Sequence, residues 1–227
     1  MIRMRVLQLS FYGDHNLGLF AKASDKFCIL GKFVSERSAE RIGETLHVDV
    51  EKATIAATDF IGMLCCMNSN GILLPGIATR EEVERFESIK RRMGVNLEVL
   101  NSKFTALGNL ILCNDNGAVI SRLLKNEKKI IEDCLGVETE FCSVAGIDVV
   151  GSCGIATNKG CLLHRDASEQ EIKKIKSILK VDVGIGTANF GSPFVGACGF
   201  ANSNAAVMGE STTGPEIHRV MESLQFI

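Results

Sequence analysis

Five glycines recur along this chain of 227 residues at intervals of 44, 46, 43 and 45 residues. They are Gly18, Gly62, Gly108, Gly151 and Gly196, and we refer to them as the marker glycines. Six residues after each one stands a small polar residue, namely Ser24, Asn68, Asn114, Thr157 and Asn202. Repeats of this length are typical of a supersecondary unit that is copied in tandem. The spacing therefore predicts five copies of one unit.

The copy that begins at Gly62 gives the clearest pattern of strands. Residues 63–67 are apolar and predict a first strand, and residues 68–71 predict a tight turn, because Asn and Gly tolerate a positive φ. Residues 72–74 predict the return strand. A third strand, with alternating apolar and polar side chains, is expected after a helix. Across the chain, third strands are expected near 48–55, 95–101, 137–144 and 181–187.

Each copy also predicts a helix between its second and third strands. In the second copy, Thr79 and Glu82 have the spacing of a capping box, in which each side chain satisfies an unpaired donor at a helix start. Apolar residues then recur at helical spacing. The pairs Ser168–Glu171 and Thr213–Glu216 repeat this pattern. Helices are expected near 35–46, 79–93, 126–135, 168–180 and 213–224.

The fifth copy has no third strand of its own, whereas a strand is expected at residues 3–10, before the first copy. We expect this N-terminal strand to complete the fifth unit, which would close a ring and remove two exposed strand edges. The expected fold class is therefore α/β, a five-unit α/β propeller in a single domain. The expected units are about 16–60, 61–106, 107–149, 150–194 and 195–227 with strand 3–10. An open stack of repeats is the alternative, but it would need polar capping repeats.

The composition argues against a free nucleic-acid-binding protein and against a membrane protein. The net charge is −2, and 46% of the residues are hydrophobic, enough for a substantial core. Free nucleic-acid binders usually carry a basic stripe, but Lys and Arg here are mixed with Glu along the predicted helices. No apolar run approaches the ~18 residues of a membrane helix, and the N-terminus lacks the apolar region of a signal peptide. We therefore expect a cytoplasmic protein that does not enter a membrane.

Nine cysteines without a secretion signal argue against a disulfide framework. Cys28 and Cys161 occupy equivalent positions in two copies, as Cys153 and Cys198 do, which is typical of small buried side chains. The sequence contains no Cys-x-x-Cys motif, so a zinc site is not expected. We expect no metal and no cofactor.

Nucleophilic catalysis needs a Cys or Ser beside a base. His164 is the only histidine expected near the centre of the ring, and Cys198 could be its partner. Buried cysteines are normally inert, however, and Asp25, Asp59, Asp115 and Asp148 fit turns better than general acid–base pairs.

The junctions around the marker glycines are expected at one end of the ring. Their sequences are rich in small residues, weakly charged and partly apolar, so they favour docking on a protein over docking on a phosphate backbone. The alternative is that the glycines serve only the geometry of the ring. The candidate binding face comprises Asn16, Leu17, Thr58, Asp59, Leu107, Asn109, Val150, Ser152 and Ser192.

The chain resembles the translation initiation factor 6 family in its archaeal form. The resemblance extends over essentially the whole chain. It rests on residues 16–22, 71–75, 107–109 with 113–115, 149–152 and 162–164. It implies the pentein fold, a five-bladed α/β propeller with pseudo-five-fold symmetry. It also implies a protein that is not an enzyme. Such a protein binds the intersubunit face of the large ribosomal subunit, prevents the small subunit from joining, and takes part in large-subunit biogenesis.

The resemblance further implies a ribosomal protein as the main contact, with some rRNA, and the loops at one end of the propeller as the binding face. Among these positions, Asn109 is the one we favour most. We expect a monomer with no small-molecule substrate. Two alternatives stay open at this point. One is a guanidine-modifying pentein hydrolase that uses Cys198 and His164, and the other is a scaffold that binds a different protein through the same face.

Overall fold

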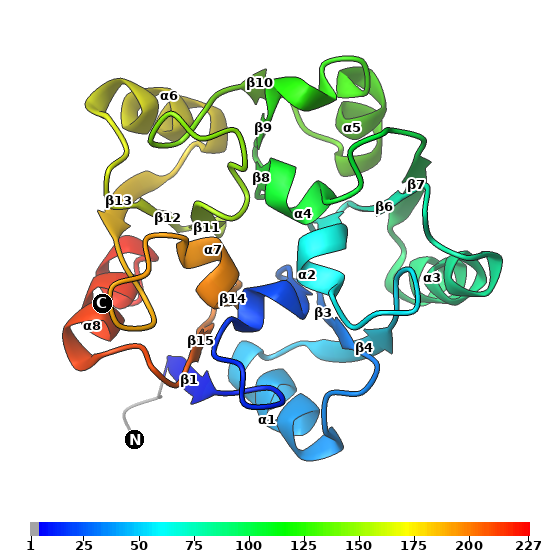
Figure 1. Cartoon of the computed structure of the whole chain (residues 1–227), viewed down its shortest axis with the longest axis horizontal. Coiled ribbons are helices and arrows are strands. Elements are labelled where there is room, and N and C mark those ends of the chain that lie inside the picture. The colour runs from blue at the N-terminus through cyan, green and yellow to red at the C-terminus, as the bar shows by residue number, and fades with distance from the viewer. Residues whose placement is uncertain (1–4) are drawn as a thin grey trace.

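The computed structural model describes residues 5–227 and is a mixed α/β structure with five three-stranded sheets. Figure 1 shows five similar units arranged around a common centre. The first four sheets comprise β2 (Ala21–Ala23), β3 (Phe27–Gly31) and β4 (Asp49–Ala53); β5 (Cys66–Met67), β6 (Gly71–Pro75) and β7 (Asn96–Leu100); β8 (Ile111–Cys113), β9 (Ala118–Ile120) and β10 (Thr139–Phe141); and β11 (Gly154–Ala156), β12 (Gly160–His164) and β13 (Asp182–Gly186). The fifth comprises β14 (Gly199–Ala201), β15 (Ala206–Gly209) and β1 (Val6–Leu9).

One longer helix precedes the third strand of each sheet or, in the fifth unit, follows β15. These helices are α1 (Glu36–Leu46), α3 (Arg80–Met93), α5 (Lys128–Leu135), α6 (Glu169–Leu179) and α8 (Gly214–Ser223). Their bounds lie within two residues of the predictions, because the predicted capping boxes form at Thr79, Ser168 and Thr213. The third strands are confirmed but shorter than predicted. A 3₁₀ turn, η2 (Arg122–Leu124), precedes α5.

The N-terminal strand joins the fifth sheet. β1 pairs in parallel with β15, with Val6 opposite Ala206 and Leu9 opposite Gly209. The strand was predicted over 3–10, of which residues 3 and 4 lie outside the described residues. In every sheet the first strand runs antiparallel to the second, and the third runs parallel to the second. β1 thus occupies the place that β4, β7, β10 and β13 have in the other sheets.

The marker glycines are crowded by the backbone of a neighbouring unit. A Cβ on Gly62 would lie 1.9 Å from the carbonyl oxygen of Gly18, far inside van der Waals contact. Gly108 faces Gly62 in the same way, Gly151 faces Gly108, Gly196 faces Gly151, and Gly18 faces Gly196. The first strands β2, β5, β8, β11 and β14 also contact one another in this order, and β14 contacts β2. Only glycine permits this approach.

One expectation about these glycines is wrong in detail. Residues 63–67 were predicted as one strand, but α2 (Ile61–Leu64) takes the first part and β5 only Cys66–Met67. Three more single turns hold the equivalent positions: η1 (Leu17–Leu19), α4 (Leu107–Leu110) and α7 (Val195–Cys198). Residues 150–153 form a turn there in the fourth unit. A run of four or five apolar residues does not distinguish a buried helical turn from a strand.

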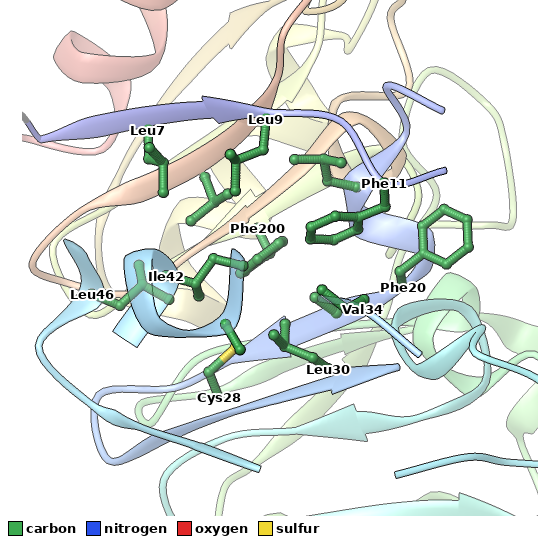
Figure 2. Packing of buried hydrophobic residues seen from close by; sticks show 14 of the residues in the cluster. Leu7, Leu9, Phe11, Phe20, Cys28, Leu30, Val34, Ile42, Leu46 and Phe200 are labelled. Carbon is green, nitrogen blue, oxygen red and sulfur yellow. The ribbon is translucent and has the colours of Figure 1, made fainter. Parts of the chain in front are cut away.

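The hydrophobic core lies between neighbouring units. Figure 2 shows Leu7 and Leu9 of β1 on one side of this core and Leu30 of β3 on the other, with Ile42 of α1 and Phe200 of β14 between them. The second cluster likewise combines β3 with β6 and α3. Burying a side chain of this size contributes about 1.5–3 kcal/mol. Each unit is therefore stabilised mainly by its neighbour.

The hairpin turns use asparagine for a different reason from the one predicted. No residue of 68–71 has a positive φ. Instead, the Asn68 Oδ1 atom accepts the N–H groups of Asn70 and Gly71. Its Nδ2 group donates to the carbonyl oxygens of Asn114 (3.1 Å) and Leu135 (2.9 Å), in the next unit. The latter bond satisfies a carbonyl at the end of α5, which helix termini leave unpaired.

Candidate docking surface at the marker-glycine end

The strand directions place several loops at one end of the molecule, which we call the marker end. Each first strand starts there, after a marker glycine, and runs antiparallel to the second strand. The second and third strands are parallel to each other, so both finish at the marker end. The loops that follow them, together with the single turns around the marker glycines, form this end of the molecule, which faces the viewer in Figure 1.

Most of the exposed large apolar side chains of the described residues belong to these loops. Phe190 is 84% exposed at the tip of the loop after β13, and Phe33 is 68% exposed after β3. The full set at this end is Tyr12, Phe33, Phe60, Ile77, Leu123, Phe190 and Phe194. Single exposed apolar residues are ordinary, but a group gathered at one end of a molecule is typical of an interaction site.

Asp59 holds the aromatic residues of the first and second units. Its Oδ2 atom accepts a hydrogen bond from the Tyr12 hydroxyl (2.5 Å), and its carboxylate accepts the N–H of Phe33 (3.1 Å to Oδ2). Phe20 packs between the rings of Tyr12 and Phe60, with centroid distances of 5.8 and 5.3 Å. Burial, the hydrogen bond to Asp59 and its negative charge raise the pKa of the Tyr12 phenol. Tyr12 is therefore a neutral donor.

Capping-box glutamates anchor the loops of this end. The Glu82 carboxylate accepts the N–H groups of Ala56 and Ala57, both at 2.8 Å, besides that of Thr79 in its own capping box. Ala56 and Ala57 have φ values of 52° and 58°, a conformation that costs an L-residue about 1–2 kcal/mol. Such strain persists only where other contacts impose it, and here Glu82 does so.

Capping-box glutamates of the fourth and fifth units bind loop N–H groups in the same way. Glu171 accepts from Ala145 and Gly146, and Glu216 accepts from Phe190 and Gly191. Burial raises the pKa of Glu171, but hydrogen bonds from Ser168, Gly146 and Ser143 outweigh it and lower the pKa to about 2. The pKa values of Glu82 and Glu216 are lowered by the same balance. These glutamates stay ionised at neutral pH.

Asn189, in the loop after β13, connects the fourth unit to the first and fifth units at this end. The Asn189 Nδ2 group donates to the carbonyl oxygen of His15 (2.7 Å) and to Oδ1 of Asn16 (3.4 Å). The Asn189 Oδ1 atom accepts from the Thr212 hydroxyl (3.0 Å). The side chain of Asn16 is thus held by its neighbours rather than free in solvent.

The structure divides the nine predicted site residues into two groups. Leu17, Leu107 and Val150 are fully buried, so their side chains belong to the core below the loops. The partly exposed residues are Asn16, Thr58, Asp59, Asn109, Ser152 and Ser192. All nine lie at or directly beside the single turns or in the loops of the marker end.

The exposed aromatic residues were missed as site candidates. The predicted site residues stand next to or near the marker glycines, whereas Tyr12, Phe33 and Phe190 lie in loops farther from them. The sequence contained a pattern that could have indicated two of them. In Tyr12-Gly13 and Phe190-Gly191, an aromatic residue stands directly before a turn-forming glycine. Aromatic side chains on exposed turns are enriched at protein interfaces.

Cys198 and His164, the possible catalytic pair, have different neighbours. The Sγ atom of Cys198 lies 4.0 Å from Oδ1 of Asn16, and burial raises its thiol pKa. His164 is buried, its Nδ1 atom accepts the N–H of Asp166 (3.1 Å), and its ring packs against Phe194. No hydrogen bond joins the two side chains in the described part of the chain.

Residues 5–227 contain neither a cluster of metal ligands nor a membrane-spanning helix. No group of three or more His, Cys, Asp or Glu side chains within residues 5–227 is arranged to hold a metal ion. Over the same range, none of the helices combines the length and apolar character needed to cross a membrane.

Comparison with known proteins places these features in a family. The model of the eIF-6 family matches residues 6–223. A protein of Pyrococcus abyssi named Translation initiation factor 6 is 43% identical over 99% of this chain and 100% of its own length. Proteins of the same name from Methanocaldococcus jannaschii and Thermococcus onnurineus are 39% and 36% identical, over 98–99% of this chain and 99–100% of their own. The chain therefore belongs to the eIF-6 family.

Proposed function

We propose that this protein binds the large ribosomal subunit at its intersubunit face and thereby prevents the small subunit from joining. The observation that carries the proposal is the family match over residues 6–223, with full-length relatives that are named translation initiation factors. The proposed role covers translation initiation and the maturation of large subunits. It requires no chemistry from the protein.

The proposed binding surface is the marker end. Its support is the group of exposed apolar side chains held in place by Asp59 and the capping-box glutamates. Held loops lose little conformational freedom on binding, which favours affinity. The partly exposed polar residues, with Asn109 foremost, complete the surface as a polar rim.

We further propose that the five units form a closed pentein propeller and a single domain. This is supported by the contact between β14 and β2 and by the pairing of β1 with β15. A closed arrangement leaves no free strand edge between units and holds the marker-end loops in one plane. The rigid surface would then be a property of the whole chain.

The mechanism would be steric exclusion. A protein of 24.6 kDa bound at the joining face occupies volume that the small subunit needs. A standard protein interface buries about 800 Å² per partner, which one end of a domain of this size can supply. We propose that the partner is mainly a ribosomal protein, with a minor rRNA contribution, and that the factor acts as a cytoplasmic monomer.

Sedimentation tests the proposal. Archaeal large subunits would be centrifuged through a sucrose gradient with the purified protein, and small subunits would then be added. We expect the protein to co-sediment with the large subunit and the joined-ribosome peak to disappear. Protein that stays at the top of the gradient, with normal subunit joining, would contradict the proposal.

A pair of variants tests the surface. Replacing Phe33 and Phe190 by Ser should weaken co-sedimentation at least tenfold, because both side chains are exposed at the marker end and neither supports the core. Ile227→Ser is the matched control: Ile227 is 63% exposed but follows α8 at the opposite end. Equal losses from both changes would exclude the marker end as the binding face. A steep salt dependence would instead indicate many phosphate contacts and a larger role for rRNA.

A further inference from the structure

A small cavity lies between the five first strands. Its volume is about 40 Å³, enough for a few water-sized molecules. Residues of β2, β5, β8, β11 and β14 all contribute to its wall. Apart from backbone groups, its reactive side chains are two thiols, Cys66 and Cys113, and the amine of Lys22.

The two thiols touch each other. The Sγ atoms of Cys66 and Cys113 are 3.5 Å apart, a distance at which one S–H donates to the other sulfur. Cys66 is buried, whereas Cys113 is partly exposed, and its Sγ also lies within hydrogen-bond distance of the Met67 carbonyl oxygen (3.3 Å). Both are free cysteines. They belong to adjacent strands of different units, β5 and β8, and are 47 residues apart.

We propose that Cys66 and Cys113 are a redox-active dithiol, which a small peroxide converts into a disulfide between the second and third units. All four of Cys66, Cys113, Cys28 and Cys161 lie in or against apolar core clusters, but Cys66 and Cys113 are distinguished by the contact between their sulfur atoms. Both cysteines line a cavity that is wide enough for a water-sized oxidant. The proposal does not depend on ribosome binding.

The chemistry has two steps. The more accessible Cys113 releases its proton and attacks one peroxide oxygen as its thiolate; the O–O bond breaks, the leaving hydroxide takes up the released proton, and a sulfenic acid and one water form. Cys66 then attacks the Cys113 sulfur, the S–S bond forms, and the S–O bond breaks. The hydroxide that leaves takes the Cys66 proton and becomes the second water. Two thiols thus lose two electrons and two protons, and one peroxide is reduced to two waters.

The surroundings assign the order of attack. The hydrogen bond with Cys113 and burial raise the pKa of Cys66, while the ammonium of Lys22 lowers it. Cys66 therefore stays protonated until the leaving hydroxide can take its proton, which suits a resolving thiol. Because the bond would close a long loop, it should stabilise the protein against unfolding.

Peptide mapping provides a direct test on the full chain. The reduced protein would be treated with a small excess of hydrogen peroxide, the remaining thiols blocked, and the protein digested with trypsin without reductant. Cys113 is the only cysteine of tryptic peptide 104–122, and Cys66 lies in peptide 53–80. We expect these peptides to be linked, the thiol count to be two below the initial nine, and the urea midpoint to rise. Dithiothreitol should reverse all three.

Four variants make the test specific, because peptide 53–80 also contains Cys65. Cys113→Ala and Cys66→Ala should abolish the linked peptide. Cys65→Ala should retain it, as should Cys142→Ala, which removes another partly exposed thiol. Linkage through Cys65, or oxidation of Cys113 only to sulfinic acid, would overturn the proposal. If a variant does not fold, peptide mapping of the parent protein after peroxide treatment still shows whether peptides 53–80 and 104–122 are linked.

Discussion

At the scale of single residues, the marker glycines are the positions with the least freedom to change. Gly62 approaches the backbone of the first unit so closely that a methyl group has no space, since backbone atoms cannot move aside as a flexible side chain can. A role in the geometry of the ring was one of the two interpretations of these glycines from the sequence, and the structure shows that they are crowded by the backbone of a neighbouring unit.

Gly62→Ala should therefore destabilise the protein by about 3 kcal/mol. The new Cβ would lie 1.9 Å from the Gly18 oxygen and 2.5 Å from the Ala21 oxygen, so the two units would have to separate. Urea unfolding would measure the loss. Gly214→Ala is the control: its Cβ would meet nothing within 4 Å at the start of α8, so a change of about 0.5 kcal/mol or less is expected. Equal effects of the two substitutions would refute the crowding argument.

At the scale of elements, the capping boxes have two tasks. The sequence pattern Thr/Ser-x-x-Glu correctly predicted three helix starts. It did not reveal that each glutamate also accepts N–H groups from the strained loop that precedes the unit's marker glycine. Helix caps and marker-end loops are thus coupled, so a change at a cap should reach the proposed docking surface.

Glu171→Gln tests this coupling through pH. The folded-state pKa of Glu171 is about 2, below the ~4.3 of an unfolded chain. Its ionised form therefore stabilises the fold above the unfolded value, and that stability is lost as pH falls from about 5 towards 2. The parent should lose more stability over this range than Glu171→Gln, as measured by urea unfolding at several pH values. Glu169→Gln, an exposed change in the same helical turn, should behave as the parent does. Parallel curves for parent and Glu171→Gln would contradict the assignment.

At the scale of the whole molecule, the cores between units make the five units interdependent. Leu7 of β1 packs in a cluster with residues of α1 and β3, which belong to the first unit. The sheet that β1 completes belongs to the fifth unit, at the other end of the chain. Loss of one unit would expose the apolar faces of its two neighbours. We therefore expect the whole chain to unfold as one domain.

Leu7→Ala measures this interdependence. It should cost about 2–5 kcal/mol and shift a single unfolding transition rather than loosen one end of the chain. The protein has one tyrosine, Tyr12, and no tryptophan, so tyrosine fluorescence reports on one place while circular dichroism reports on all five units. The two signals should change together in the parent and in the variant. A fluorescence change that clearly precedes the dichroism change would show separate folding units.

The sequence by itself determined the repeat, its strand and helix order, the helix starts and the place of the N-terminal strand. These depend on interactions within a few residues or on a period that runs along the whole chain. The tertiary structure alone decided why the hairpins need asparagine, which loops carry exposed aromatic rings, and that Cys66 meets Cys113. The asparagine and cysteine pairs are contacts between units about 45 residues apart, and the exposure of a loop side chain depends on how the units pack. A small rotation of one unit would change the neighbours of all these residues. Local sequence patterns do not determine how the units are oriented relative to one another.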